Sequence, residues 1–208
     1  MEEHVPIIGI ARHRLGVDGE GVTTLVVFHS CPLRCKYCLN PRTITESTEH
    51  IEHFTCKELY GKVKADELYF LATGGGVTFG GGEPALRYEF VRDFRKICGE
   101  KWRIYVETSL NVPQQNIEAL ISVVDGFIVD VKDMNPNIYE AYTKRDNTQV
   151  LANLRFLANQ GRQDDVLVRL PLIPDFNTAY DRGESRAILE KMGFMRFDEF
   201  VYIKFLLL

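Results

Sequence analysis

Short apolar segments alternate along this chain of 208 residues with stretches that have the periodicity of a helix. The segments are rich in Val, Ile, Phe and Tyr, which is typical of buried parallel strands. Six such strands are predicted, at residues 23–29, 76–79, 103–107, 127–131, 166–170 and 200–205. Six strand-then-helix units favour an α/β fold with a parallel sheet. Their spacing is compatible with a doubly wound sheet and with a barrel.

Helix signals lie between the predicted strands. A capping-box pattern at residues 55–58 opens one helix. Apolar residues at helical spacing predict two more helices, over residues 85–98 and 148–160, and a further helix is expected over 181–191. No repeat, low-complexity stretch or linker interrupts the pattern, so residues 1–208 are expected to form one domain.

Polar and charged residues follow the predicted strands at their carboxyl ends. They are Cys31, Gly80 to Glu83, Glu107, Thr108, Asp130, Lys132, Arg169 and Lys204. Any one of them could simply reach solvent. However, ligand sites of parallel α/β folds form at the carboxyl ends of the strands, and charges there are costly to bury unless they are paired or used. We therefore expect these residues to meet at one rim around a polar ligand.

Three cysteines, Cys31, Cys35 and Cys38, stand directly after the first predicted strand. A thiolate triplet this compact can bind one corner of a [4Fe–4S] cluster, and such sites normally take four cysteines. One iron would then lack a protein ligand and be open to another molecule. The triplet therefore predicts an iron–sulfur site with an exchangeable position.

Three other interpretations of the triplet compete with the cluster. A structural zinc site needs four ligands, typically two close pairs, and neither Cys56 nor Cys98 nor His29 completes a second pair. An electron-transfer ferredoxin needs a fourth cysteine nearby. Cysteines can also be buried as small apolar residues, but a triplet flanked by Arg34 and Lys36 fits a core poorly. Cys56 and Cys98 are expected to be structural.

Composition narrows the class further. The net charge of -4, with both signs interspersed, gives no argument for nucleic acid, so protein or small-molecule partners are expected. No apolar run is long enough to span a membrane and the N-terminus is not that of a signal peptide, which favours the cytoplasm. Five cysteines suit a reducing compartment rather than a disulfide framework. An exposed cluster with an open iron points to an anaerobic setting.

The cysteine spacing after a strand resembles the signature of the radical S-adenosylmethionine (SAM) enzymes. Further stretches occur in the order seen in glycyl-radical-enzyme activating enzymes of the pyruvate formate-lyase activating type: the segments at residues 16–21, 74–84, 130–132 and 169–174. This resemblance implies a partial (β/α)6 barrel, open on one side, that holds a [4Fe–4S] cluster and SAM. It also implies that the fourth iron takes the amino and carboxylate groups of SAM.

The resemblance implies a role for individual residues. The predicted SAM contacts are Tyr37 at adenine, Gly81, Gly82 and Glu83 at the amino group, Asp130 and Lys132 at the ribose and carboxylate, and Arg169 at the carboxylate. Glu107, Thr108 and Asp130 match a monovalent-cation site, although Glu107 replaces the family's aspartate. For the glycines a plain turn, and for Tyr37 core packing, are the competing interpretations.

The same resemblance implies a protein substrate. The radical formed from SAM would take a hydrogen atom from a backbone glycine of a glycyl radical enzyme, admitted through the open side of the barrel. Asp18, in the loop before the first strand, is expected to face that substrate, although Glu20 replaces a proline of the family pattern. A flavodoxin or ferredoxin is the expected electron donor, and the protein is expected to be a monomer.

Two features leave alternatives open. Between Cys38 and Gly80 the chain holds only Cys56, which fits the single-cluster type. The four apolar residues that end the sixth-strand stretch, 205–208, look like a truncation. The alternatives are a radical SAM peptide-modifying enzyme, an anaerobic ribonucleotide reductase activase, and a cluster-carrying electron-transfer module that binds no SAM.

Overall fold

The computed structural model describes residues 3–44 and 51–202, and it confirms an α/β fold with an open, mostly parallel sheet. Its eight strands follow the order β3-β1-β2-β4-β5-β6-β7-β8. The chain forms two compact units. Unit 1 holds residues 1–31, 40–108 and 115–128, and unit 2 holds residues 32–39, 109–114 and 129–208. The single domain expected from the sequence stays a prediction.

Unit 1 contains three of the predicted parallel strands. They are β2 (Val22–Phe28), β4 (Gly76–Gly81) and β5 (Arg103–Thr108), and β4 pairs in parallel with both neighbours. Two antiparallel strands were not predicted: β1 (Val5–Leu15) and β3 (Glu52–Phe54). β1 was missed because Pro6, Gly9 and the polar run Arg12 to Arg14 interrupt its apolar pattern.

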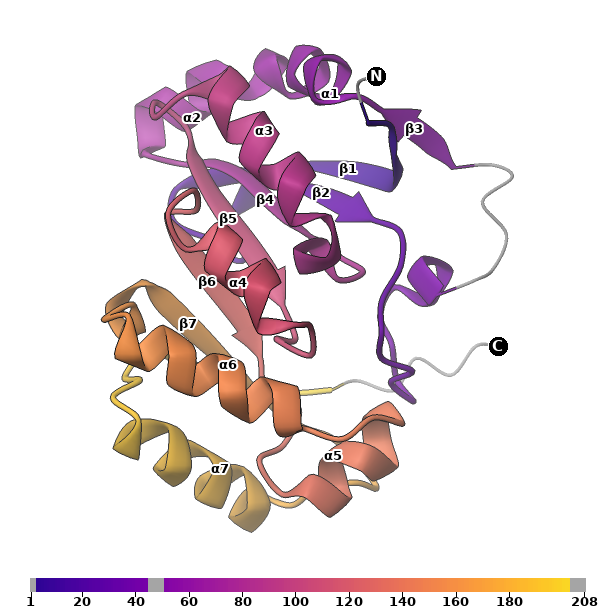
Figure 1. Cartoon of the computed structure of the whole chain (residues 1–208), viewed down its shortest axis with the longest axis vertical. Coiled ribbons are helices and arrows are strands. Elements are labelled where there is room, and N and C mark those ends of the chain that lie inside the picture. The colour runs from indigo at the N-terminus through magenta and orange to yellow at the C-terminus, as the bar shows by residue number, and fades with distance from the viewer. Residues whose placement is uncertain (1–2, 45–50, 203–208) are drawn as a thin grey trace. The chain divides into compact units, whose positions relative to one another are not determined.

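The helices of unit 1 begin where the local sequence favours them. The predicted capping box opens α1 (Cys56–Val63): the Thr55 hydroxyl accepts from the backbone N–H of Glu58, and the Glu58 carboxylate accepts from that of Thr55. The predicted helix over 85–98 is divided into η3 (Pro84–Arg87) and α3 (Tyr88–Cys98). In Figure 1, α1 and α3 lie side by side. The remaining short helices are η1 (Pro41–Ile44), η2 (Lys64–Asp66), α2 (Glu67–Thr73) and α4 (Gln114–Leu120), whose first residue belongs to unit 2.

An aromatic core joins β2 and β4 to α3. The Phe79 ring stacks on Phe28 with centroids 5.4 Å apart and meets the edge of Phe94 at 5.3 Å. Phe28 also meets Phe90 edge to face at 5.7 Å. All four side chains are buried, so the carboxyl ends of β2 and β4 are held against one helix.

Unit 2 contains the last strands and helices. β7 (Val166–Leu172) pairs in parallel with β8 (Phe197–Val201), and α7 (Ala179–Lys191) packs on β7. The other elements are α5 (Pro136–Thr143), α6 (Thr148–Asn159) and η4 (Gln163–Asp165). β6 (Gly126–Asp130) crosses the boundary between the units.

The predicted elements of unit 2 differ from the observed ones mainly at their ends. The helix predicted over 148–160 is α6. α7 begins earlier than predicted because Thr178 and Asp181 form a second capping box. The strand predicted over 200–205 is observed three residues earlier, as β8, and Lys204 lies outside the described residues. In the part of the chain that is described, no helix is long and apolar enough to cross a membrane.

The aromatic core of unit 1 makes a stability prediction. Phe79→Ala removes a side chain that is 0% exposed and leaves a cavity, so the free energy of unfolding of unit 1 should fall by about 3–5 kcal/mol. Urea unfolding followed by the fluorescence of Trp102, the single tryptophan, measures it. Leu68→Ala, at a side chain that is 76% exposed, is the control and should change stability by about 0.5 kcal/mol or less. An equal loss in both variants would contradict the assignment of this core.

Candidate functional site

The glycine-rich turn after β4 is bonded to the segment that leads into Cys31. The backbone N–H of Gly82 donates to the carbonyl of Phe28 at 3.1 Å, and that of Glu83 donates to the carbonyl of Ser30 at 2.7 Å. A Cβ on Gly82 would lie 2.2 Å from the Ser30 carbonyl oxygen, so no larger residue fits there. Gly82 is therefore required for the close approach that places Cys31 beside this turn.

Gly81 and Glu83 flank this contact. Gly81 has a φ of 87°, a left-handed value that favours glycine, and its carbonyl accepts a hydrogen bond from Asn40 at 3.5 Å. Glu83 is 1% exposed, and its Oε1 accepts from the backbone N–H of Ala85 at 3.2 Å, which caps η3. Gly81 and Glu83 therefore stabilise the turn itself. Their contact with SAM stays a prediction.

The loop that carries Cys35 and Cys38 is attached to the end of α5. Arg34 donates its backbone N–H to the Thr143 carbonyl at 2.8 Å, and Lys36 donates to the Tyr142 carbonyl at 3.1 Å. The last carbonyls of a helix have no partner within the helix, so they are available to hold such a loop. The side chain of Arg145 adds a bond to the Pro32 carbonyl at 3.2 Å. This backbone support positions both thiols of unit 2.

All three cysteines of the triplet are thiols of intermediate exposure. Burial raises the pKa of the Cys35 thiol; Lys132 opposes that shift, and Cys38 and Asp130 add to it. No three His, Cys, Asp or Glu side chains in residues 3–44 and 51–202 form a single-ion site. In a [4Fe–4S] cluster each thiolate binds a different iron, so the ligands need not converge on one point.

Lys132 places a buried ammonium group in unit 2. Its side chain is 7% exposed, and its Nζ lies 3.0 Å from Asp130 Oδ2 and 3.0 Å from the Tyr202 hydroxyl. Burial alone would lower its pKa, but Asp130 and the surrounding groups raise the pKa of Lys132 well above its usual value. The ammonium therefore stays charged.

An ammonium has three N–H donors, and Lys132 gives two of them to Asp130 and Tyr202. The third has no acceptor among the residues that the structure describes. Arg169 is the second buried cation of this unit: it is 8% exposed and its Nε lies 3.5 Å from Asp198 Oδ2. Its carbonyl accepts from Val131 at 3.1 Å, which ties β7 to the segment between Asp130 and Lys132.

Tyr37 belongs to an aromatic cluster in unit 2. The cluster contains Tyr142, Ile173 and Tyr202, with Cys35, Tyr37, Phe176 and Phe200 packed against it. The Tyr37 hydroxyl donates to Asp175 Oδ2 at 2.7 Å, and its ring meets the Phe176 ring edge to face at 5.8 Å. Tyr37 therefore makes the contacts expected of a residue that packs in the core, although its side chain is only half-buried. Its contact with adenine stays a prediction.

The site residues predicted from the sequence divide between the units. Unit 1 holds Asp18, Cys31, Gly81, Gly82, Glu83, Glu107 and Thr108, and unit 2 holds Cys35, Tyr37, Cys38, Asp130, Lys132 and Arg169. The predicted cation ligands Glu107, Thr108 and Asp130 come from both units, and Asp130 accepts from Lys132. That cation site stays a prediction.

Asp18 is 2% exposed, and its carboxylate lies 2.5 Å from Nε of Arg14. Its carbonyl accepts from the Thr78 hydroxyl. At the next residue, Gly19, an added Cβ would collide with the ring of Tyr105. These contacts hold the loop in unit 1, and the role of Asp18 toward a substrate stays a prediction.

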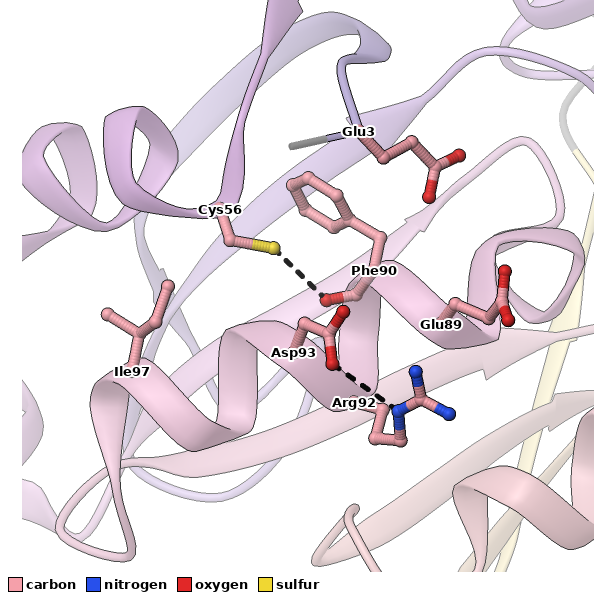
Figure 2. A pocket seen from close by; sticks show the side chains of 7 residues that line it. All are labelled: Glu3, Cys56, Glu89, Phe90, Arg92, Asp93 and Ile97. Atoms are coloured by element: carbon pink, nitrogen blue, oxygen red, sulfur yellow. Dashed lines mark hydrogen bonds and ion pairs between the residues drawn. The ribbon is translucent and has the colours of Figure 1, made fainter. Parts of the chain in front are cut away.

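Cys56 and Cys98 both belong to unit 1, whereas Cys35 and Cys38 belong to unit 2. Figure 2 shows the Cys56 thiol pointing to the carbonyl of Phe90, to which it donates at 3.4 Å, in a cavity of about 280 Å³ that Glu3, Glu89 and Asp93 also line. Burial, opposed by Arg95, raises the pKa of Cys98 to about 11, and its thiol donates to the Arg95 carbonyl at 3.7 Å. Both thiols are bonded to backbone carbonyls within unit 1, which fits a structural role.

Sequence reasoning missed the partners of the predicted residues. Tyr202, Tyr142 and Phe176 surround Lys132, Cys35 and Tyr37 without belonging to any motif used above. The sequence feature that could have indicated them is their aromatic character, near the ends of α5, β7 and β8. The three thiols and the buried ammonium with an unused donor nonetheless suit a cluster and an anionic cofactor group.

Comparison with known proteins agrees with this chemistry. Residues 25–180 match the model of the radical SAM superfamily. The chain is 31% identical to the pyruvate formate-lyase 1-activating enzyme of Escherichia coli K12, over 81% of this chain and 70% of that protein. It is 29% identical to the (2S)-3-sulfopropanediol dehydratase activating enzyme of Klebsiella oxytoca, over 85% of this chain and 74% of that one.

Solved structures show the same fold. SuiB of Streptococcus suis, in a crystal structure with its precursor peptide SuiA, matches with a TM-score of 0.65 at 14% identity, over 86% of this chain and 39% of SuiB. QueE of Escherichia coli matches with a TM-score of 0.51 at 12% identity, over 94% of this chain and 93% of QueE. At these identities the likeness concerns the fold alone.

The chain belongs to the radical SAM superfamily, and within it to the glycyl-radical-enzyme activating enzymes. It is thus an enzyme whose family cofactors are a [4Fe–4S] cluster and SAM.

The sequence spacing of the triplet and the contacts of the other two cysteines predict which thiols bind iron. Anaerobic reconstitution should load about four irons per chain through Cys31, Cys35 and Cys38, and replacing any one of these by alanine should lower the iron content. Replacing Cys56 and Cys98 together should leave the count unchanged, because both thiols donate to backbone carbonyls of α3. Iron analysis with the visible absorption spectrum measures both. Loss of iron in the double variant would mean that one of the two is a fourth ligand.

Proposed function

We propose that this protein is a glycyl-radical-enzyme activase, which removes a hydrogen atom from a backbone glycine of a partner enzyme and leaves a glycyl radical there. The observation that carries the proposal is the 31% identity over 81% of the chain to an enzyme named for activating pyruvate formate-lyase. The cysteine triplet supports it, because all three thiols match the family's signature.

The cofactors supply the reaction and the protein supplies binding and orientation. When bound, the cluster and SAM would supply one-electron cleavage of a carbon–sulfur bond of SAM, with methionine as one product and the glycine's hydrogen atom carried away in 5′-deoxyadenosine. Cys31, Cys35 and Cys38 would hold the cluster. A flavodoxin or ferredoxin would return the electron, and a reducing cytoplasm would keep the thiols reduced.

The charges of unit 2 would bind the polar parts of SAM. The unused N–H donor of Lys132 suits a carboxylate, and Arg169 offers a second buried positive charge. Tyr37 would pack on the adenine from the half-buried edge of the aromatic cluster. In unit 1, Gly81, Gly82 and Glu83 would take the amino group, since the turn is held rigid by its bonds to the segment before Cys31.

The contribution of Lys132 can be measured directly. Lys132→Ala should weaken SAM binding about ten- to a hundred-fold, because a charge-assisted hydrogen bond in a partly dry site contributes about 1.5–3 kcal/mol. Equilibrium binding of SAM to the anaerobic, reconstituted protein gives the Kd. The iron content should stay the same, which serves as the control for folding. Unchanged affinity would remove Lys132 from the SAM site.

The identity of the substrate is tested with the partner enzyme. Reduced protein, SAM and the partner glycyl radical enzyme should together give a doublet in the electron paramagnetic resonance spectrum. That signal should be lost when the partner's radical-site glycine becomes alanine. SAM should be cleaved only slowly without the partner, because the radical is productive once the peptide fills the pocket and excludes water.

The alternative functions give other outcomes in the same experiment. Activation of an anaerobic ribonucleotide reductase alone would identify a reductase activase. Modification of a short peptide, with no glycyl doublet in any partner, would identify a peptide-modifying enzyme. If SAM stays intact in every mixture, the protein would be the cluster-carrying electron-transfer module that binds no SAM.

A further inference from the structure

Tyr202 stands directly after β8 and is held there by the sheet. Its backbone N–H donates to the Leu172 carbonyl at 3.0 Å, which continues the pairing of β7 with β8 by one more bond. The side chain is 8% exposed, and its ring lies 5.4 Å from the Phe200 ring and 6.3 Å from the Tyr142 ring. Backbone and ring are therefore both held in place.

The Tyr202 hydroxyl is aimed at the ammonium of Lys132. The oxygen lies 3.0 Å from Nζ, at the same distance as Asp130 Oδ2, and Nζ lies 5.6 Å from the centre of the Tyr202 ring. The two acceptors come from different elements, the end of β6 and the end of β8. A lysine side chain has four flexible carbons, so two acceptors on separate elements restrict its ammonium far more than one does.

The chemistry of the two acceptors differs in a way that matters for binding. A carboxylate alone would neutralise the ammonium and compete with any anionic ligand for it. A hydroxyl accepts a hydrogen bond without adding a negative charge. Lys132 with Asp130 and Tyr202 thus keeps its position, while the third N–H has no acceptor among the residues that the structure describes.

We propose that Tyr202 is a positioning residue for SAM binding: its hydroxyl, with Asp130, aims the third N–H of Lys132 at the carboxylate of SAM. This inference rests on the proposed function, because it takes SAM as the ligand. Tyr202 itself touches Lys132 and not the cofactor.

A double-mutant cycle tests the inference on the full chain, reconstituted anaerobically. Tyr202→Phe removes the hydroxyl and keeps the ring, and it should raise the Kd for SAM about five- to twenty-fold with iron content unchanged. In the Lys132→Ala background the same change should alter the Kd by less than about two-fold, because the hydroxyl then has no ammonium to position. A merely structural role for Tyr202 would weaken binding equally in both backgrounds.

Tyr142→Phe is the matched control. Tyr142 belongs to the same aromatic cluster, and its buried hydroxyl makes no hydrogen bond to Lys132. Removing that hydroxyl should leave the Kd for SAM unchanged. A loss equal to that of Tyr202→Phe would overturn the inference, because any hydroxyl of the cluster would then serve.

The proposed function and the positioning role of Tyr202 fail in different ways. If Lys132→Ala weakens SAM binding and Tyr202→Phe does not, Tyr202 has no positioning role and the proposed function is unaffected. Additive losses in the cycle overturn the positioning role in the same way. If the reconstituted wild-type protein binds no SAM, the proposed function and the inference are both wrong.

Discussion

The burial of a positive charge at Lys132 is the constraint on which the arrangement of unit 2 depends. Moving an ammonium out of water costs several kcal/mol, which must be offset by partners with good geometry. Asp130 supplies the opposite charge and Tyr202 a neutral acceptor and a ring face. These partners stand at the ends of β6 and β8, so the register of the strands decides whether the charge is tolerated.

Unit 1 positions its site residues by a different means, namely close packing of backbone. The turn at Gly81 and Gly82 and the segment before Cys31 lie so near each other that a Cβ on Gly82 would overlap a carbonyl oxygen. The aromatic core of Phe28, Phe79 and Phe94 lies under the same strand ends and limits their movement. Backbone hydrogen bonds, rather than charges, therefore orient the turn.

These two kinds of construction suit the activity that we propose. A radical reaction needs few acid or base groups from the protein, but it needs cofactors held in one orientation and protected from water. Backbone contacts hold the segments that carry the thiols, including the loop bonded to the end of α5. Buried charges suit the polar groups of SAM. A mixture of backbone contacts and buried charge would suit two cofactors of different chemistry.

Much of this protein could be predicted from local sequence. Apolar runs and capping boxes are properties of neighbouring residues, and they indicated the parallel strands and several helices. The spacing of Cys31, Cys35 and Cys38 is equally local, and the cluster that it predicts stays a prediction. β1 was missed because an antiparallel strand with one exposed face need not be a continuous apolar run.

Only the tertiary structure decided what lies beside each predicted residue. Tyr202 follows Lys132 by 70 positions, and Asp175 follows Tyr37 by 138. Such pairs leave no periodic trace, because they depend on the pairing of β7 with β8 and on the attachment of the cysteine loop to α5. The sequence by itself determined which chemical groups this protein carries. The packing of strands and helices decided which of those groups share a buried charge or a hydrogen bond, since such contacts form only when distant segments meet.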